Sequence, residues 1–451
     1  MSIASSPIPD VVLLQPRRYA RDAGSLILIP LLPQKPPAKS LPNEIWIKIL
    51  WYVYAEYAEE GQGPSRSQAL TVLRQSLLVI CKALKDVALP LYYRHVQFTT
   101  SCALERFTDL LLAADQRWDS IRRIPYSTPG RWVQVLDLTD LRCSFWSDVC
   151  HTDELLTRLF PLLPFLKHLV LNDTLPLSRR VLTSMCTRDG NERLKSIRGV
   201  KLVSSAVDFD DPFLTLIHCC VNLEELGFTG SGIETLLIDS PTPSVDPGYV
   251  QPKPLHLPYL RRLSIVSMHS SPVMFALLHA DLPSLSHLTV TPYDDVTIGS
   301  SLVPTFIEKH GSKLRSLHLY APKSWPTMLF PSPTTLLHTC PQLYHISLES
   351  PLPTLTICSI YPKHPLQIIS IPRPIPEFLS VLESLLPKLP NLRIVRARDV
   401  RWLRAGMSSH AMEAGVQGEL RQWKQRLARR GIKVVDATWS SPADDIEIRR
   451  H

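Results

Sequence analysis

Long apolar runs, a secretion signal and patterned cysteines are all missing from this sequence of 451 residues. The longest apolar candidate near its start, Leu26–Leu32, contains Pro30 and is far shorter than the ~18 residues of a membrane-spanning helix. The start also lacks the charged-then-apolar layout of a secretory signal. The nine cysteines form no C-x-x-C pair and no regular spacing, so they indicate no disulfide framework. We therefore expect a cytoplasmic or nuclear protein that does not enter a membrane.

Signatures of catalysis are missing as well. The sequence contains no G-x-S-x-G, no G-x-G-x-x-G and no P-loop. Gly227-x-x-Gly230-x-Gly232 has the wrong spacing for a phosphate cradle, and we expect it to turn the chain after a strand. We predict a protein that is not an enzyme and that needs no cofactor and no metal.

A repeated motif is what the sequence does contain. The pattern apolar-x-x-apolar-x-apolar recurs about ten times after residue 130, and its alternation predicts a short strand with one buried face. Successive copies start roughly 23 to 37 residues apart, in or near the range of leucine-rich repeats. The copies start at Val133, Leu166, Leu194, Leu223, Leu260, Leu285, Leu314, Leu343, Leu366 and Leu392. The third copy is degenerate because Gly199 replaces its last apolar residue, and the Pro241–Pro254 loop in the longest step is a candidate interruption.

The segments between the copies change to helical spacing, as in 213–217, 274–278, 303–307 and 378–386. Several of them reach a proline just before the next strand, and a proline cannot continue a helix. These prolines are Pro164, Pro258, Pro283, Pro341 and Pro390. The region from about 130 to 436 resembles an irregular leucine-rich-repeat solenoid, an α/β fold with parallel strands on the concave side and helices on the convex side. Coincidental leucine spacing in an ordinary α/β domain is the alternative.

A small helical unit is predicted ahead of the repeats, over residues 40 to 98. Pro42 and Glu44 suit the first turn of a helix, and the segment from Ile45 to Val53 is apolar around nearly its whole circumference. Such a helix must be buried on more than one side, and a unit of this size has little core of its own. One side is therefore expected to pack internally, while the other meets a second protein or the solenoid.

Three ordered signatures in this unit carry a resemblance. They are Leu41-Pro42, Glu44-Ile45 and Ile49-Leu50 at the opening, Val79-Ile80 and Cys81-Lys82 with Leu84 in the place of an aromatic, and Leu91-Tyr92-Tyr93-Arg94-His95-Val96 at the end. The polar interval Glu59–Ser67 predicts a loop that lengthens the gap between the first two signatures. Together the signatures resemble an F-box, and an F-box ahead of leucine-rich repeats is the arrangement of a known, fungal-type family.

The resemblance implies a substrate-recognition adaptor of an SCF-type (cullin–RING) ubiquitin ligase. In that family the F-box docks on a Skp-type linker protein, which joins it to a cullin scaffold, and the repeats hold the protein substrate. The adaptor raises the effective concentration of substrate near activated ubiquitin. The motif positions for linker binding are Leu41, Pro42, Ile45, Ile49, Leu50, Cys81, Lys82, Leu91 and Tyr92. The alternative is a leucine-rich-repeat protein-binding scaffold without a ligase role, whose N-terminal helices cap the solenoid.

Residues between the apolar positions of each copy are expected on the concave face, where aromatic, Arg and His side chains make good interface anchors. The candidates for the substrate face are Arg262, His287, His318, Tyr320, His345, Glu349, Arg396 and Arg398. The three histidines lie on successive strands, about 4.8 Å apart, so their side chains can approach one another. No carboxylate or cysteine accompanies them at matching positions, so a hydrogen-bonding or pH-sensitive patch is favoured over a metal site.

Positive charge is concentrated at the C-terminal end. The net charge is +8, and arginines cluster between Arg393 and Arg404 and again between Arg421 and Arg430. Such clusters can bind phosphate backbones, but no aromatic platform interleaves them, so a solvated basic face on a capping helix is favoured over nucleic-acid binding. The predicted organisation is a disordered proline-rich segment 1–39, the F-box-like unit 40–98, the solenoid with its helical cap 99–436, and a disordered tail 437–451.

Overall fold

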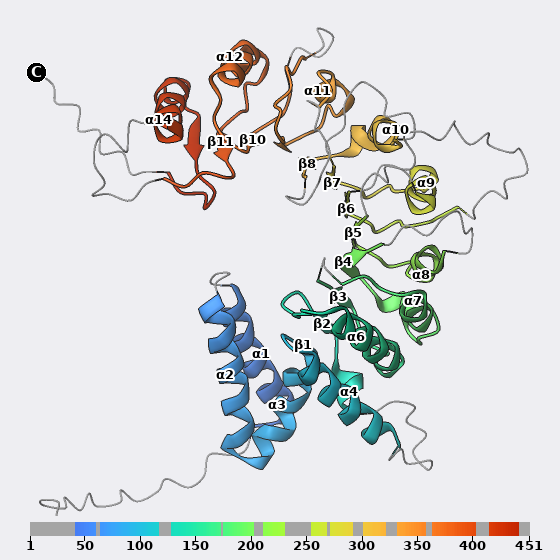
Figure 1. Ribbon diagram of the computed structural model, residues 1–451. Coiled ribbons are helices and arrows are strands. Elements are labelled where there is room, and N and C mark those ends of the chain that lie inside the picture. Colours follow the sequence, from blue (N-terminus) through green and yellow to red (C-terminus); the bar gives the residue numbers. More distant parts are fainter. Residues whose placement is uncertain are drawn as a thin grey trace, which may run out of the picture.

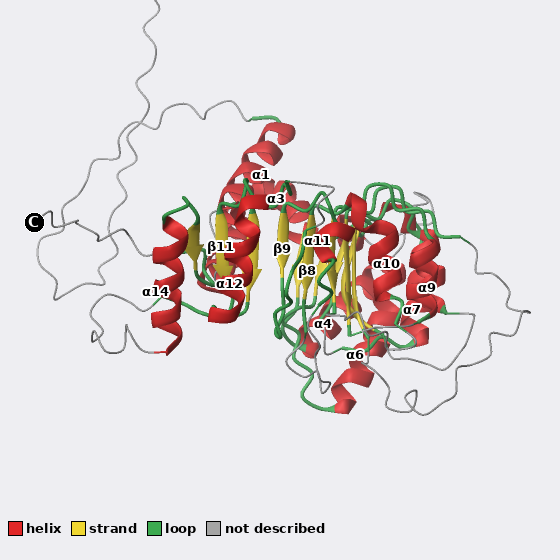
Figure 2. Ribbon diagram, turned by 90° about the horizontal axis from the view of Figure 1, so that it is seen from above, coloured by secondary structure: helices red, strands yellow, loops and turns green. Residues whose placement is uncertain are grey.

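One continuous parallel sheet organises the molecule. The computed structural model describes residues 41–59, 64–116, 128–172, 175–202, 211–230, 254–267, 271–291, 301–321, 332–357, 363–402 and 415–441. Within these residues the sheet has 12 strands, which follow one another in chain order from β1 (His95–Gln97) to β12 (Lys433–Val435). Figure 1 shows the strands on the inner side of an arc and the helices on its outer side, and Figure 2 shows the same two layers from above. The predicted α/β repeat solenoid is therefore confirmed.

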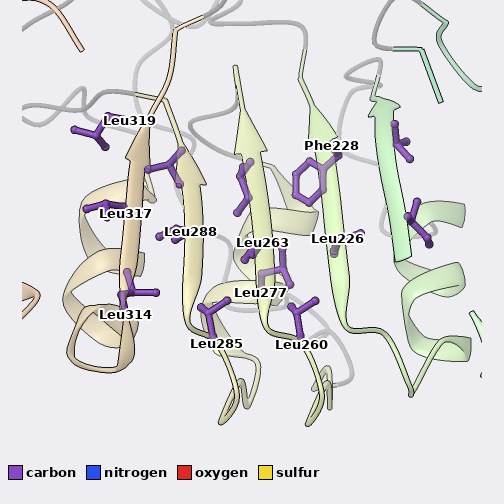
Figure 3. Close-up of a cluster of buried hydrophobic side chains, with 14 of the residues drawn as sticks. Leu226, Phe228, Leu260, Leu263, Leu277, Leu285, Leu288, Leu314, Leu317 and Leu319 are labelled. Atoms are coloured by element: carbon purple, nitrogen blue, oxygen red, sulfur yellow. The ribbon is translucent and has the colours of Figure 1, made fainter. Parts of the chain in front are cut away.

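The ten strands between these two coincide with the ten motif copies. They are β2 (Val135–Asp137), β3 (His168–Val170), β4 (Ser196–Lys201), β5 (Glu225–Thr229), β6 (Arg262–Val266), β7 (His287–Val290), β8 (Ser316–Leu319), β9 (His345–Ser347), β10 (Ile368–Ile371) and β11 (Ile394–Ala397). In each copy the first apolar residue lies before the strand and the second lies within it, and both are buried. The rows of leucines that result, Leu260, Leu285 and Leu314 below Leu263, Leu288 and Leu317, are almost completely buried (Figure 3). Burying one such side chain stabilises the fold by about 1.5–3 kcal/mol, so the repeat itself supplies the core.

Helices cover the outer side of the sheet. They are α4 (Ser101–Gln116), α5 (Thr128–Trp132), α6 (Trp146–Leu159), α7 (Arg179–Cys186), α8 (Pro212–Cys219), α9 (Pro272–His279), α10 (Val303–His310), α11 (Leu336–Thr339), α12 (Pro376–Leu385) and α14 (Gly415–Ala428). All five predicted proline stops lie in turns before a strand; four of them, Pro164, Pro283, Pro341 and Pro390, follow a described helix, whereas the segment ahead of Pro258 lies largely outside the described residues. No helix among the described residues is long and apolar enough to cross a membrane.

The third motif copy contains a β-bulge. Its strand β4 pairs with β5 at Ile197, then shifts register so that Val200 pairs with Phe228. Gly199 has φ of +73°, a conformation open to glycine, and accommodates the extra residue. Val200 is buried and takes the place of the missing apolar residue. The third copy therefore departs from the motif as predicted, because one inserted residue moves its last apolar position from Gly199 to Val200.

The longest step between copies does not interrupt the sheet. Strands β5 and β6 pair in register along their whole length, from Glu225 with Arg262 to Thr229 with Val266. The hydrogen-bonded sheet is therefore continuous at the predicted interruption. The loop proposed for it, Pro241–Pro254, lies outside the described residues except for its last position.

Two edge strands extend the sheet beyond the motif. Strand β1 pairs with β2, and β12 pairs with β11 at the opposite edge. Each is only 3 residues long, too short for an alternating pattern to be recognised. Residues 95–97, at the end of the predicted helical unit, thus belong to the sheet of the solenoid.

The N-terminal unit consists of α1 (Asn43–Glu59), α2 (Pro64–Ile80) and α3 (Lys82–Arg94). Its small core, formed by Leu50, Val87 and Ala88, is separate from the core of the solenoid. The predicted loop Glu59–Ser67 was too long, because α1 includes Glu59 and α2 begins at Pro64, with residues 60–63 outside the described part. Proline is tolerated in the first helical turn, where its missing N–H has no partner to lose.

An aromatic stack joins this unit to the solenoid. Tyr93, near the end of α3, lies between Phe107 of α4 and Trp132 of α5, with ring centroids 6.2 and 6.1 Å away. Burial, together with the neighbouring Tyr92, raises the pKa of the Tyr93 hydroxyl. The helical unit is therefore attached to the first repeats through α3.

Helix α14 closes the other end of the solenoid. Its Trp423 is buried and stacks on Phe378 of α12 with 6.4 Å between ring centroids. The described chain continues to residue 441, and the Ala437 N–H donates to the carbonyl of Val400 at 2.8 Å. The predicted disordered tail, 437–451, thus begins with an ordered turn. Residues 442–451 and the predicted disordered segment 1–39 lie outside the described residues.

Candidate protein-binding surfaces

An apolar surface covers the outer side of α1. Its large exposed side chains are Ile45, Trp46, Ile47, Ile49, Trp51 and Tyr52. Ile45 and Ile49 are each 40% exposed. Leu50, which precedes Trp51, is only 4% exposed and belongs to the small core of the unit. The extensive contacts of α1 are with α2 and α3. Exposed apolar side chains gathered on one helix make it a candidate interaction surface.

The other predicted linker-binding residues lie around this unit. Leu41 and Pro42 are exposed at the start of α1, and Leu91 and Tyr92 are half-buried on α3. Cys81 and Lys82 are exposed at the junction of α2 and α3. Next to them, Val79 is 82% exposed and Ile80 is 63% exposed. The C-terminal end of α2 therefore carries a second exposed apolar surface.

The middle signature of the F-box resemblance has a local structural role. Cys81 precedes α3, and its sulfur accepts a hydrogen bond from the backbone N–H of Leu84 at 3.4 Å, which caps the helix. Leu84, which replaces an aromatic residue, packs against the small core beside Val87. The substitution at this position therefore keeps an apolar side chain inside the unit.

The predicted substrate-face residues lie on or next to the concave side of five strands. Arg262 is on β6, His287 on β7, His318 on β8 with Tyr320 just beyond it, His345 on β9 with Glu349 beyond it, and Arg396 on β11 with Arg398 beyond it. In the register of the sheet, His287 and His345 flank Ser316 in one row. His318 lies in the next row, beside Thr289 and Ser347.

Arg398 crosses the C-terminal half of this face. Its Nη1 donates to Nε2 of His318 at 2.9 Å, and its Nη2 donates to the Leu348 carbonyl at 2.7 Å and to the Glu349 carboxylate at 3.0 Å. Burial and the Arg398 guanidinium lower the pKa of His318 to about 4. The imidazole is therefore neutral at pH 7 and can accept this hydrogen bond.

His345 is held in a second polar network. Its Nε2 lies 2.9 Å from Oγ of Ser370, and its Nδ1 lies 3.5 Å from Oγ of Ser316. Burial, followed by Arg396 and Arg398, lowers the pKa of His345 to about 4. The histidines are thus engaged separately, and no group of three or more His, Cys, Asp or Glu side chains in the described part of the chain is placed to hold a metal ion.

Ion pairing divides the concave face into three parts. On β4 and β5, or just before them, Lys195 pairs with Glu224 at 2.6 Å and Arg198 with Glu225 at 3.5 Å. At the C-terminal end Arg398 pairs with Glu349. Between these parts, Arg262 and Arg315 lie on either side of His287. Burial, followed by the positive charges of these two arginines, lowers the pKa of His287.

Arg315 was not among the predicted site residues. It occupies the second motif position, in the turn before β8, whereas the sequence assignment considered only positions within the strands. Lys195, Arg261 and Arg393 hold the same motif position in other copies. The recurrence of a basic residue at the second motif position was the sequence feature that could have identified Arg315.

The arginines near the C-terminal end are partly engaged within the chain. Arg396 donates from Nη2 to the Ala437 carbonyl at 2.6 Å, and its guanidinium carbon lies 4.4 Å from the ring centroid of Trp439. On α14, Arg426 pairs with Glu383 of α12 at 3.6 Å. These contacts fit a capping element with a basic outer face.

Comparisons with known proteins leave the family open. No protein-family model matches the chain, and no curated protein matches it. A crystal structure of a Bacteroides fragilis protein from a structural-genomics programme aligns with a TM-score of 0.26 at 13% identity, covering 53% of this chain and 68% of that one. A likeness of that size supports no conclusion, so the solenoid assignment depends on the sheet and the repeat themselves.

Proposed function

We propose that this chain is a substrate-recognition adaptor of an SCF-type (cullin–RING) ubiquitin ligase. The α1–α3 unit docks on a Skp-type linker protein, and the concave face of the solenoid holds a protein substrate. One observation carries the proposal: α1 buries Leu50 in the core of its own unit, yet leaves Ile45 and Ile49, which point in other directions around the helix, exposed. That is the two-sided arrangement that the F-box resemblance requires.

The same observation weighs against the scaffold alternative. Helices that only cap a solenoid should bury their apolar faces against the first repeats. Here Tyr93 of α3 makes that contact, while the outer face of α1 is turned to solvent. The α1 surface therefore fits a separate partner better than a cap.

The mechanism in this proposal is positional. The adaptor holds one protein on α1–α3 and another on the solenoid, so that reaction partners meet at high effective concentration. A rigid sheet suits this task, because its anchors keep fixed spacings from strand to strand. The bond chemistry belongs to other subunits of the ligase.

Co-purification of the full-length chain with a Skp-type linker protein tests the proposal. The unchanged protein should form a complex, and Ile45→Asp should abolish it, because a carboxylate would be desolvated in an apolar interface. Val221→Asp is the matched control: Val221 is 44% exposed, follows α8, and should tolerate the change without loss of binding. Circular dichroism verifies that both variants are folded. Failure of the folded, unchanged chain to bind the linker would favour the scaffold alternative.

A further inference from the structure

The middle of the concave face holds arginines that the carboxylates of the described residues do not neutralise. Arg262 on β6 and Arg315 before β8 are exposed and lie on either side of His287 on β7. Within the described residues, neither guanidinium has an ion-pair partner among the carboxylates. Both positive charges therefore remain available to a bound molecule.

Two neighbouring carboxylates in the described part of the chain are committed elsewhere. Glu225 neighbours Arg262 in the register of β5 and β6, but it accepts a hydrogen bond from Ser196 at 3.0 Å and pairs with Arg198, both on β4. Glu224 lies close enough to Arg261 for the two charges to interact, but its ion pair is with Lys195. Both acidic groups thus serve the N-terminal part of the face.

Groups suited to recognition surround the two arginines. Tyr344 follows Arg315 in the register of the turns, with its N–H donating to the Arg315 carbonyl at 2.8 Å, and its side chain is exposed. Hydroxyls of Ser264, Thr289 and Ser316 line the strands between the arginines. Exposed Tyr and Arg side chains on a rigid support are typical anchors of protein interfaces.

We infer that this central concave surface, formed by Arg262, His287, Arg315 and Tyr344, binds an acidic segment of a protein partner. Its glutamate or aspartate carboxylates receive paired hydrogen bonds from the two guanidiniums, a geometry that arginine supports better than lysine. The two arginines lie two strand spacings apart, about 10 Å, so a segment must carry more than one carboxylate to engage both. This inference depends on the proposed function only in naming the class of substrate.

Fluorescence anisotropy with the full-length chain and a labelled peptide of alternating Glu and Gly tests the inference. In extended form such a peptide places its carboxylates on one side. It should bind, and a Gln–Gly peptide of equal length should not. Arg262→Ala and Arg315→Ala should each weaken binding about tenfold, and Arg262→Lys should weaken it less than Arg262→Ala. Arg158→Ala, on the outer helix α6 where Arg158 pairs with Asp109, should leave the affinity unchanged.

Several results would overturn the inference. They are no binding of the Glu–Gly peptide, equal binding of the Gln–Gly peptide, or a Glu–Gly affinity that the double variant of Arg262 and Arg315 leaves unaltered. Binding of a phosphoserine–Gly peptide or a single-stranded oligonucleotide without binding of the Glu–Gly peptide would likewise assign the surface to another ligand. The peptide assay needs no linker protein, so its outcome is separate from the co-purification test: Ile45→Asp should lose the linker and keep the peptide.

Discussion

Arg398 donates a hydrogen bond to His318 across the concave face, although the two residues are 80 positions apart in the chain. The same guanidinium also binds Leu348 and Glu349, so one side chain ties the end of β11 to β8 and β9. The bond requires an unprotonated His318 Nε2, because guanidinium groups donate and never accept. The integrity of this half of the solenoid is therefore coupled to pH.

Acidification should destabilise the protein between pH 6.5 and about 4. His318 and His345 have a pKa of about 4 in the folded chain, against about 6.5 when unfolded. The unfolded state therefore binds more protons in this window, and stability is full above pH 6.5 and falls as pH decreases. Urea denaturation at several pH values measures this. His318→Gln keeps an acceptor for Arg398 but does not titrate, so its stability should fall less steeply; identical slopes for variant and parent would contradict the prediction.

Gly190→Ala should destabilise the protein by more than the usual cost of a left-handed residue. Gly190 has φ of +81°, and an added Cβ would lie 2.3 Å from the Pro164 carbonyl oxygen. Gly431 supplies the control, because its φ is +74° but nothing lies within 4 Å of an added Cβ. Gly431→Ala should cost about 1–2 kcal/mol. Thermal unfolding of both variants tests the ranking, and a Gly190→Ala variant as stable as Gly431→Ala would refute the clash.

Tyr93→Ala should loosen the attachment of the N-terminal helices without unfolding the repeats. The substitution removes stacking on both Phe107 and Trp132, which together contribute roughly 1–3 kcal/mol. Hydrogen exchange should accelerate in α3 and β1 while the strands from β5 onward keep their protection. Tyr93→Phe keeps an aromatic ring that can stack on both Phe107 and Trp132, so its amide hydrogens should exchange like those of the parent. Uniform acceleration along the whole sheet would show that the junction is not a local element.

Trp423→Ala should release the C-terminal cap. Trp423 is 1% exposed and stacks on Phe378, so its removal leaves a cavity and should cost about 3–5 kcal/mol. Trp439 is 48% exposed and contacts Arg396 through its ring face, so Trp439→Ala should cost about 0.5–1 kcal/mol. Chemical denaturation compares the two. Similar losses in both variants would contradict the assignment of α14 as the cap.

Most of the fold was predictable because its code is local. Each motif copy shows its buried positions within six residues, and each proline marks where a helix must stop. The failures were local too: β4 hides an inserted residue at Gly199, and β1 is too short to alternate. The start of α2 at Pro64 was missed because a polar, proline-containing segment also has the composition of a loop.

The candidate sites were predictable only in part. Alternation placed Arg262, His287 and Arg398 on the concave face, but it could not distinguish a paired arginine from an unpaired one. Arg315 was not predicted as a site residue because it lies in the turn before β8 and not in the strand itself. Pairing depends on how side chains from different repeats reach one another, and no window along the chain contains both partners.

By itself, the sequence determined the repeat, its strands and helices, and the apolar helix that begins at residue 43, because these follow from periodicities of a few residues. Tertiary structure alone decided that Ile45 faces solvent while Leu50 is buried, that Arg398 is neutralised by Glu349, and that Arg262 and Arg315 are not neutralised by carboxylates of the described residues. The physical reason is that burial and charge pairing are properties of neighbours in space. In a solenoid those neighbours come from other repeats, about 25 to 80 residues away along the chain.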